Sequence, residues 1–410
     1  MTPYHRRDIT PLLQTALREM PVVVLTGMRQ AGKSTLLQRE PALRRRRYVS
    51  LDDFATLEQA ERAPESLLQG LEPITIDEAQ RAPQLLVAIK RLVDARRRAG
   101  QFLLSGSANF ALLRQVSESL AGRALYLTLH PMDRRELAGT VATPPALFQF
   151  LSTHQWPSPR RFSPLTLREV LRGGMPVVGL RHVQDPALWF RGYEQTYLER
   201  DVRALSQVAD LVAFRTLLQL AALRTGQILN QSELGRDAKL NATTTARYLS
   251  LLETSCLINR LPPYRRNRAS RLIKSPKLYL ADAGLAAHLM GLGLDAPPPG
   301  HQPLVGALVE TYVVHNLLSV CASRQPEARV YFWNLQGRYE VDVVIEVEGK
   351  VIAIEIRWGT RWKEHDLAGL RAFLAQTPHG HATGILAYNG TEAVSLGDRL
   401  WAVPLGMLLS

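Results

Sequence analysis

Eight consecutive residues have the types and the spacing of a loop that binds phosphate groups. Residues 27–34 match G-x-x-x-x-G-K-[ST] in full, after a short apolar run at 21–26 and before a helix-like stretch. In such a loop the backbone N–H groups surround the β-phosphate, Lys33 reaches the β- and γ-phosphates, and Ser34 is a ligand of Mg²⁺. The sequence therefore predicts that the chain binds ATP or GTP together with Mg²⁺. The predicted nucleotide contacts are Gly27, Met28, Arg29, Gln30, Ala31, Gly32, Lys33, Ser34 and Thr35.

An acidic pair could supply the metal ligand and the general base that nucleotide hydrolysis requires. Asp77 and Glu78 end the β-branched run 74–76, downstream of the phosphate loop. Asp77 would hold the metal, directly or through water, and Glu78 would polarise the attacking water as a general base. Acidic pairs are common at strand ends, so the loop upstream is what gives this pair its functional interpretation.

The elements around these motifs predict an α/β domain followed by two others. Short β-rich runs alternate with helical patterns over the first 140 residues, at 21–26, 47–51, 73–76, 101–105 and 124–129. Residues 141–164 read as an irregular connection, and the proline-rich segment 295–303 is the clearest linker. The predicted domains are residues 1–164, 165–294 and 304–410.

The middle of the chain has the pattern of a helix-turn-helix. An amphipathic helix at 212–225 precedes a short helix capped by Asn230 or Ser232 and a second helix at 240–253. In this arrangement the second helix reads the major groove of DNA. Its exposed face would offer Thr243, Thr244, Arg247 and Tyr248.

A basic stretch between two strands completes a winged-helix topology. The strands are 256–261 and 277–280, and the residues from one to the other include no acidic side chain. The basic residues are Arg260, Arg265, Arg266, Arg268, Arg271, Lys274 and Lys277. A solvated charge run usually mixes signs, so this run favours contact with nucleic acid, with Arg265, Arg266, Arg268, Arg271 and Lys274 as candidates. The alternative is a wing that contacts only proteins.

The C-terminal third carries the pattern of a PD-(D/E)XK nuclease, a restriction-endonuclease-like α/β fold. Glu310 lies on a predicted helix at 304–320, Asp342 on a strand, and Glu355 and Arg357 on one face of the next strand. In active members the carboxylates hold Mg²⁺ and a lysine positions or activates water. Here Arg357 replaces that lysine, and arginine stays protonated. Three interpretations stay open: a nuclease-like fold kept for DNA binding or assembly, a working nuclease, and coincidence.

Composition limits the partners and the compartment. Lys and Arg total 50 against 37 Asp and Glu, a net charge of +13, which favours an anionic partner, although a GC-rich genome would also enrich arginine. Cys256 and Cys321 lack metal-ligand spacing and predict reduced thiols. We expect no signal peptide, no membrane span, no membrane partner and a cytoplasmic protein.

Six segments, taken together and in order, resemble a known family. They are 27–34, Ile76–Gln80, Leu104–Ser107, Ser119–Arg123, Arg172–Pro176 and Tyr197–Asp201. The combination resembles the predicted prokaryotic AAA-superfamily ATPases that carry a C-terminal domain of unknown function, over nearly the whole chain. The resemblance implies an AAA+ module related to that of the origin-recognition initiators. It also implies a homo-oligomer, for example a hexamer, with composite ATP sites.

The resemblance to the AAA+ class implies roles for two further groups of residues, a γ-phosphate sensor and an arginine finger. A polar side chain at the end of the 101–105 strand senses the γ-phosphate in this class, and the candidates are Ser105, Ser107 and Asn109. A plain polar turn is the alternative. Arg114 and Arg123 follow where such ATPases place an arginine finger, which acts on the ATP of a neighbouring subunit. A solvated surface arginine is the alternative for each.

The leading hypothesis from sequence is a DNA-associated AAA+ ATPase. ATP hydrolysis at Lys33, Ser34, Asp77 and Glu78 would drive or license the remodelling of DNA by an oligomer. The second hypothesis is a nucleotide-dependent switch that scaffolds other proteins, and the third is an ATP-gated, Mg²⁺-dependent nuclease.

Overall fold

The chain folds into two compact units. The computed structural model describes all residues except 1–2, 71, 107–119, 159–161, 197–209, 266–270, 272–273, 295–299 and 378–380. The first unit comprises Met1–Pro131 with Thr254–Leu257, and the second comprises Met132–Glu253 with Ile258–Ser410. The first unit therefore ends earlier than the boundary predicted at 164. Residues after 131 belong with the second unit because Arg134 N–H donates to Asn316 Oδ1 at 2.6 Å and Ala146 N–H donates to the Ser410 carbonyl at 2.9 Å.

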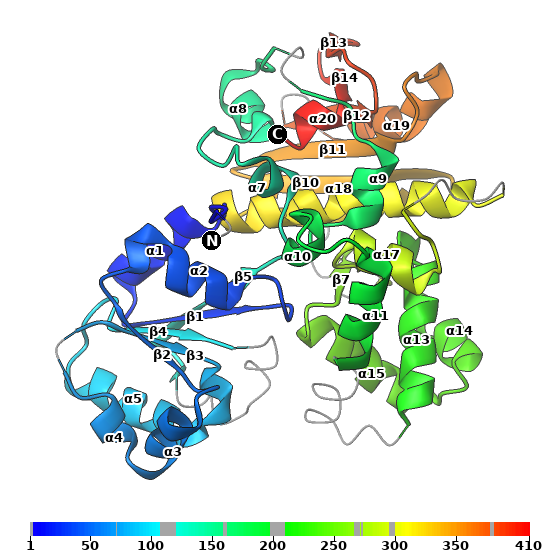
Figure 1. Ribbon diagram of the computed structural model, residues 1–410. Coiled ribbons are helices and arrows are strands. Elements are labelled where there is room, and N and C mark those ends of the chain that lie inside the picture. Colours follow the sequence, from blue (N-terminus) through cyan, green and yellow to red (C-terminus); the bar gives the residue numbers. More distant parts are fainter. Residues whose placement is uncertain are drawn as a thin grey trace. The chain divides into compact units, whose positions relative to one another are not determined.

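The first unit is built on a five-stranded parallel sheet with the order β2-β3-β4-β1-β5 (Figure 1). All five predicted strands are confirmed, as β1 (Val22–Gly27), β2 (Arg47–Ser50), β3 (Ile74–Asp77), β4 (Phe102–Ser105) and β5 (Ala124–Leu129). The register pairs Ser50 with Asp77 and Leu25 with Ser105. The polar residues that end these strands therefore meet at the carboxyl edge of the sheet.

Helices cover both faces of this sheet, which explains its continuous apolar strands. In β1, Val22 and Val24 pack into one core with residues of α3 (Phe54–Arg62), α4 (Pro64–Leu67) and α5 (Pro83–Ala95). Val23 and Leu25 pack into the other core, against α1 (Thr10–Glu19) and α2 (Lys33–Arg39). The three inner strands β3, β4 and β1 thus bury both of their faces, which holds their carboxyl ends in a fixed position.

The second unit begins with helices and contains a small antiparallel sheet. The helices are α7 (Arg134–Ala138), α8 (Ala146–Thr153), α9 (Leu167–Arg172), α10 (Pro176–Gly179), α11 (Pro186–Thr196), α13 (Leu211–Leu223), α14 (Gln231–Asp237), α15 (Ala242–Thr254) and α17 (Ala283–Leu289). The sheet has the order β6-β8-β7, with β6 (Gln227–Ile228), β7 (Ile258–Leu261) and β8 (Lys277–Leu280). Asn230 caps α14, as one of the two predicted options. β6 was not predicted, because two residues are too short to show alternation.

A buried aspartate explains the glycine pair in the Arg172–Pro176 segment. Asp282 caps α17 by accepting a hydrogen bond from Leu285 N–H at 2.8 Å, and its other oxygen accepts one from Gly174 N–H at 2.6 Å. A Cβ at Gly173 would lie 2.5 Å from the Asp282 carboxylate, and one at Gly174 would lie 2.0 Å from the Met132 carbonyl oxygen. Burial raises the pKa of Asp282 to about 6, although its backbone donors lower it. The glycines are therefore required for close packing of three chain segments.

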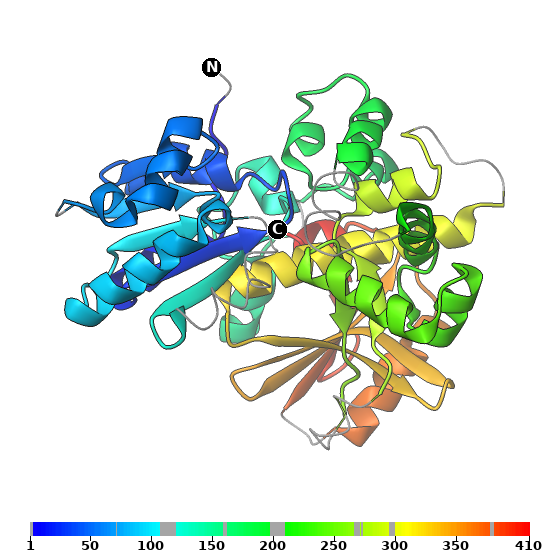
Figure 2. The same ribbon diagram turned by 90° about the horizontal axis from the view of Figure 1, so that it is seen from below.

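The rest of the second unit is a mixed six-stranded sheet flanked by helices, with the order β13-β14-β12-β11-β10-β9. The strands are β9 (Arg329–Leu335), β10 (Tyr339–Val347), β11 (Lys350–Arg357), β12 (Ala382–Tyr388), β13 (Val394–Ser395) and β14 (Leu400–Pro404). The helices are α18 (Gln302–Arg324), α19 (Ala368–Gln376) and α20 (Leu405–Leu408). The predicted strands at 329–335, 340–348 and 350–357 are confirmed, and both views show α18 lying along this sheet (Figures 1 and 2).

The long helix α18 bears on the expectation that the chain has no membrane span. Among the described residues it is the one helix of at least 18 residues that is apolar enough to cross a bilayer. However, 72% of its most apolar window is buried inside the protein. Its apolar residues, such as Val309 and Val313, therefore belong to the core of the second unit.

The packing at Gly174 predicts a sharp effect of a single methyl group. We expect Gly174→Ala to destabilise the protein by about 1–3 kcal/mol, because the new Cβ has no room against the Met132 backbone. Gly192→Ala is the matched control, since Gly192 lies inside α11 with nothing within 4 Å of its added Cβ. That change should be neutral or stabilising by up to about 1 kcal/mol. Thermal unfolding measures both, and equal melting temperatures for the two variants would contradict the packing argument.

Candidate functional site

The loop after β1 has the backbone that its glycines permit. Gly27 adopts φ 140°, and a Cβ there would lie 2.2 Å from the Leu129 carbonyl oxygen on β5. Gly32 adopts φ 95° immediately before α2. Side chains rarely adopt such angles, so both glycines are needed for the loop to turn between β1 and α2. Arg7, which is buried, donates from one guanidinium nitrogen to the Ala31 carbonyl at 2.7 Å and from another to the His130 carbonyl at 2.7 Å.

Lys33 lies inside the loop. Its Nζ donates to the carbonyl oxygens of Gly27 at 2.9 Å and Met28 at 3.0 Å, and the residue is only 7% exposed. Burial lowers the pKa of Lys33 from its ordinary value. The carbonyl dipoles compensate the buried ammonium only in part, so an anionic phosphate at this position would be strongly favoured.

Asp77 is held by side chains from two neighbouring strands. Its Oδ2 accepts a hydrogen bond from the Tyr48 hydroxyl on β2 at 2.8 Å, and its Oδ1 accepts one from Ser105 on β4. Tyr48 in turn accepts a hydrogen bond from Gln38 of α2 at 2.8 Å. Burial raises the pKa of Tyr48 to about 12, and Asp77 adds to this effect. The motifs did not indicate Tyr48, because its role depends on the pairing of β2 with β3.

Glu78 follows Asp77 in a strained backbone conformation. Its φ is 56°, in the left-handed region that residues other than glycine seldom occupy. Burial raises the pKa of Glu78, while the hydrogen bond that Gln80 Nε2 donates to its Oε2 at 2.5 Å lowers it. A carboxylate with a raised pKa at the edge of a nucleotide loop is suited to accept a proton from water.

The other predicted nucleotide contacts lie where the loop continues into α2 or fall outside the described residues. Met28 and Ala31 are buried, Arg29 and Gly32 are half-buried, and Gln30, Ser34 and Thr35 are exposed. Ser107, Asn109 and Arg114 lie outside the described part of the chain.

Arg123 lies at the amino ends of the strands, whereas the phosphate loop lies at their carboxyl ends. It precedes β5, and its guanidinium pairs with both oxygens of Asp94, at 2.5 and 2.9 Å. Since a finger acts on another subunit, its role stays a prediction, but the pair with Asp94 would have to open first.

The predicted nuclease-like residues lie close together in the second unit. Glu310 and Asp342 both contact Lys277 Nζ, at 3.0 and 3.3 Å. Arg357 pairs with Glu355 at 2.7 Å and with Asp366 at 2.9 Å. The sequence patterns assigned Glu310, Asp342, Glu355 and Arg357 to one cluster. They did not place Lys277 in that cluster.

Two of the predicted nucleic-acid contacts are wrong because their side chains are buried. Tyr248 is 1% exposed, since its ring packs against Phe214 of α13 at a centroid distance of 5.1 Å. Arg271 is 6% exposed and pairs with Glu346 at 2.8 Å. Its guanidinium also lies over the ring of Tyr264, with 4.5 Å from Cζ to the centroid. Neither residue is available to a phosphate or a base edge.

The basic stretch is consequently less available than its sequence suggests. Besides Arg271, Arg260 pairs with Glu253 at 3.3 Å, and Lys277 lies among carboxylates. Thr243, Arg247 and Lys274 are exposed, and Thr244 and Arg265 are half-buried. Arg266 and Arg268 fall outside the described residues.

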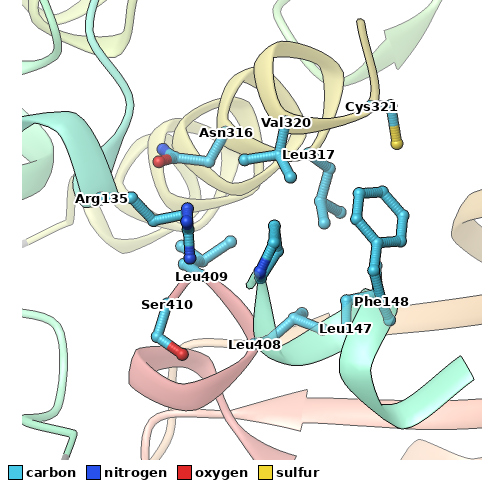
Figure 3. A pocket seen from close by; sticks show the side chains of 11 residues that line it. Arg135, Leu147, Phe148, Asn316, Leu317, Val320, Cys321, Leu408, Leu409 and Ser410 are labelled. Carbon is cyan, nitrogen blue, oxygen red and sulfur yellow. The ribbon is translucent and has the colours of Figure 1, made fainter. Parts of the chain in front are cut away.

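A small apolar cavity in the second unit does not have the size of a ligand site. Its lining comes from α7, α8, α18 and α20, and Figure 3 shows side chains such as Arg135, Phe148, Leu317 and Leu408 around it. Its volume of about 10 Å³ is close to that of one water probe. This cavity therefore provides no candidate ligand site.

Comparisons with known proteins agree with the fold. An AAA domain family matches residues 19–138, a Domain of unknown function (DUF8612) matches 165–296, and a Domain of unknown function (DUF4143) matches 305–408. The fold and the phosphate loop thus define an AAA-type ATPase with a C-terminal domain of unknown function.

Curated relatives place the chain in a family. It is 31% identical over 410 residues to the uncharacterized protein Rv2008c of Mycobacterium tuberculosis, and equally to Mb2031c of Mycobacterium bovis, covering 99% of this chain and 85% of each relative. The chain belongs to the family of these proteins, and its own matches are those of an AAA-type ATPase with a DUF4143 domain. Among solved structures, the Walker-type ATPase PABY2304 of Pyrococcus abyssi is 15% identical, with a TM-score of 0.44, over 70% of this chain and 98% of that one.

The hydrogen bond from Tyr48 to Asp77 predicts a defined kinetic effect. We expect Tyr48→Phe to raise the Mg²⁺ concentration needed for half-maximal ATP turnover and to lower kcat about tenfold, because a hydrogen bond to a buried carboxylate is lost. Nucleotide affinity should change little. Tyr126→Phe is the matched control, since Tyr126 lies on β5 of the same sheet and is 40% exposed. A Mg²⁺ titration of steady-state turnover measures the effect, and a wild-type profile for Tyr48→Phe would show that Asp77 is positioned without it.

Proposed function

We propose that the chain hydrolyses ATP at the carboxyl edge of the β2-β3-β4-β1-β5 sheet. The observation that carries this proposal is the meeting of the phosphate loop, Asp77, Ser105 and Glu78 at the ends of adjacent parallel strands. Lys33 would exchange its two carbonyl contacts for phosphate oxygens. Glu78 would take the proton of the attacking water, and its raised pKa makes it a stronger base than an ordinary glutamate.

The residues present also fit Mg²⁺. Ser34 offers an exposed hydroxyl at the start of α2, and Asp77 offers a carboxylate at the end of β3. Oxygen ligands of these kinds suit a hard cation, which neutralises charge on the phosphates. Both Asp77 oxygens already accept hydrogen bonds from Tyr48 and Ser105, which supports contact through water rather than direct coordination.

Two substitutions test hydrolysis at this site. Lys33→Ala should abolish turnover and weaken nucleotide binding, because the phosphate loses its buried cation. Glu78→Gln should abolish turnover and keep nucleotide binding, because it removes the base alone. Glu65→Gln is a matched control on α4, where the side chain is 60% exposed and pairs with Arg91. Phosphate release and nucleotide binding measure the two effects, and turnover that survives in both variants would mean that the site is elsewhere.

The leading proposal for the macromolecule on which this ATPase acts is DNA, bound through α15. The order α13-β6-α14-α15-β7-β8, with an antiparallel sheet β6-β8-β7, supports a winged helix, in which α15 would be the reading helix. Thr243 and Arg247 on α15 are exposed, as is Lys274 before β8. The net charge of +13 adds long-range attraction to a polyanion. ATP binding and hydrolysis by an oligomer, with Arg114 or Arg123 in trans, would then drive or license the remodelling of DNA.

One observation favours the second candidate, a nucleotide-dependent switch that scaffolds proteins. Arg260, Arg271 and Lys277 supply much of the apparent basic surface, yet each pairs with acidic residues of the same chain. A winged helix with fewer free cations is better suited to protein contacts than the sequence alone suggests. In that case DNA would leave the ATPase rate unchanged.

Binding to DNA at several salt concentrations separates the two candidates. If α15 contacts DNA, Arg247→Ala should weaken binding and reduce the slope of log K against log salt by about one. Arg371→Ala is the matched control, since Arg371 is 55% exposed on α19 and pairs with Glu364. The assay uses duplex, junction and single-stranded DNA, with and without ATP, and records ATPase stimulation in parallel. Absence of binding to all three at low salt would end the DNA proposal and leave the switch.

A further inference from the structure

A lysine lies inside the carboxylate cluster of the second unit. Lys277 comes from β8, whereas its partners Glu310, Glu340 and Asp342 come from α18 and β10. Its side chain is 3% exposed. Nζ lies 3.0 Å from Glu310 Oε1 and 3.3 Å from Asp342 Oδ1, and it also pairs with Glu340 Oε1.

The ammonium group has one proton for each of these three carboxylates. Its three N–H donors therefore match the three acceptors. Burial alone would lower the pKa of Lys277, but the charges of Asp342 and Glu310 outweigh burial and raise it. The three carboxylate partners therefore favour the ammonium form of Lys277.

The oxygens around Lys277 are engaged by other donors as well. The Tyr279 hydroxyl donates to Glu310 Oε1 at 2.6 Å, and Ile356 N–H donates to Asp342 Oδ2 at 2.9 Å. A divalent cation requires several oxygen ligands at about 2.0–2.6 Å. In the part of the chain that the structure describes, no three His, Cys, Asp or Glu side chains have an arrangement that could hold a metal ion.

The cluster still has a surplus of carboxyl groups. Two cations, Lys277 and Arg357, face five carboxyl groups, namely Glu310, Glu340, Asp342, Glu355 and Asp366. Glu355 Oε2 is buried without a hydrogen-bond partner among the described residues, while its Oε1 pairs with Arg357. Burial and the charge of Asp342 raise the pKa of Glu310 to about 7 and that of Glu355 to about 9, so protonation relieves part of this surplus. Loss of the Lys277 ammonium would leave the remaining carboxylates without their main counter-ion.

We propose that the Lys277 ammonium is the resident cation of this cluster, that it takes the place of a divalent metal ion, and that it fastens β8 to α18 and β10. The nuclease-like carboxylates then hold the small sheet against the six-stranded sheet, and their task is assembly rather than cleavage. Arg357 does not take over this role, since it is committed to Glu355 and Asp366. The inference depends neither on ATP hydrolysis nor on DNA binding.

Thermal unfolding of the full chain tests the counter-ion role. Lys277→Met keeps an unbranched side chain and removes the charge, so it should lower the melting temperature by about 10 °C. Lys274→Met is the matched control, because Lys274 is an exposed lysine in the same connection and should melt like the wild type. The double variant Lys277→Met/Asp342→Asn removes one of the repelling carboxylates as well and should recover part of the loss.

Mn²⁺ without nucleotide tests whether the lysine replaces a metal. We expect Mn²⁺ to leave the melting temperature of the wild type unchanged and to raise that of Lys277→Met, because the carboxylates, no longer held around an ammonium group, can then rearrange around the metal ion. Calorimetry should show the additional Mn²⁺ site in Lys277→Met. The response should be absent from the double variant, which places the site at Asp342 rather than at the nucleotide loop.

Three results would overturn the proposal. The first is stabilisation of the wild type by Mn²⁺ that Asp342→Asn abolishes, since the native cation would then be a metal. The second is a Lys277→Met protein that melts with the Lys274→Met control and gains no Mn²⁺ site. Where Lys277→Met fails to fold, the third is a double variant that folds no better than the single one.

Discussion

The parallel register of the first sheet is the constraint on which the nucleotide site depends. Hydrogen bonding of β2, β3, β4 and β1 in parallel brings the carboxyl ends of all four strands to one edge. Tyr48, Asp77 and Ser105 come from three of these strands, yet a hydrogen bond joins each of the outer two to the middle one. The burial of both faces of β1, β3 and β4 opposes a slip in register, because a shift of one residue would move the apolar side chains of these strands to the wrong core.

Two buried lysines illustrate how partners determine what a charge can do. Lys33 donates to two carbonyl oxygens, and burial lowers its pKa although the charges of Glu78 and Asp77 raise it, so the arriving charge of a phosphate would improve its surroundings. Lys277 faces three carboxylates that raise its pKa and use all of its donors. The first lysine is arranged to receive a ligand, whereas the second has its ligands within the chain. Burial is similar for the two residues and therefore does not distinguish them.

Local patterns predicted the elements and the nucleotide site because both depend on neighbours in sequence. The five strands of the first sheet and the three strands from 329 to 357 follow from β-rich runs, and the phosphate loop follows from glycine spacing. Tyr248, Arg271 and Lys277 were misjudged because their surroundings come from distant segments. Glu346 lies 75 residues from Arg271, and Asp342 lies 65 residues from Lys277. Helical spacing alone also could not show that α13 covers the Tyr248 side of α15.

The basic stretch from Arg260 to Lys277 shows when a run of like charges does not indicate an exposed basic surface. A run of one sign suggests a free surface only if no acidic residue elsewhere in the chain can reach it. Glu253, Glu310 and Glu346 all lie outside the run from Arg260 to Lys277, and each neutralises one of its members. Any nucleic-acid contact must therefore rely on the exposed Arg247 and Lys274 and on the residues between them that are not paired internally. Such a contact would be weaker and less dependent on salt than seven phosphate-binding residues would give.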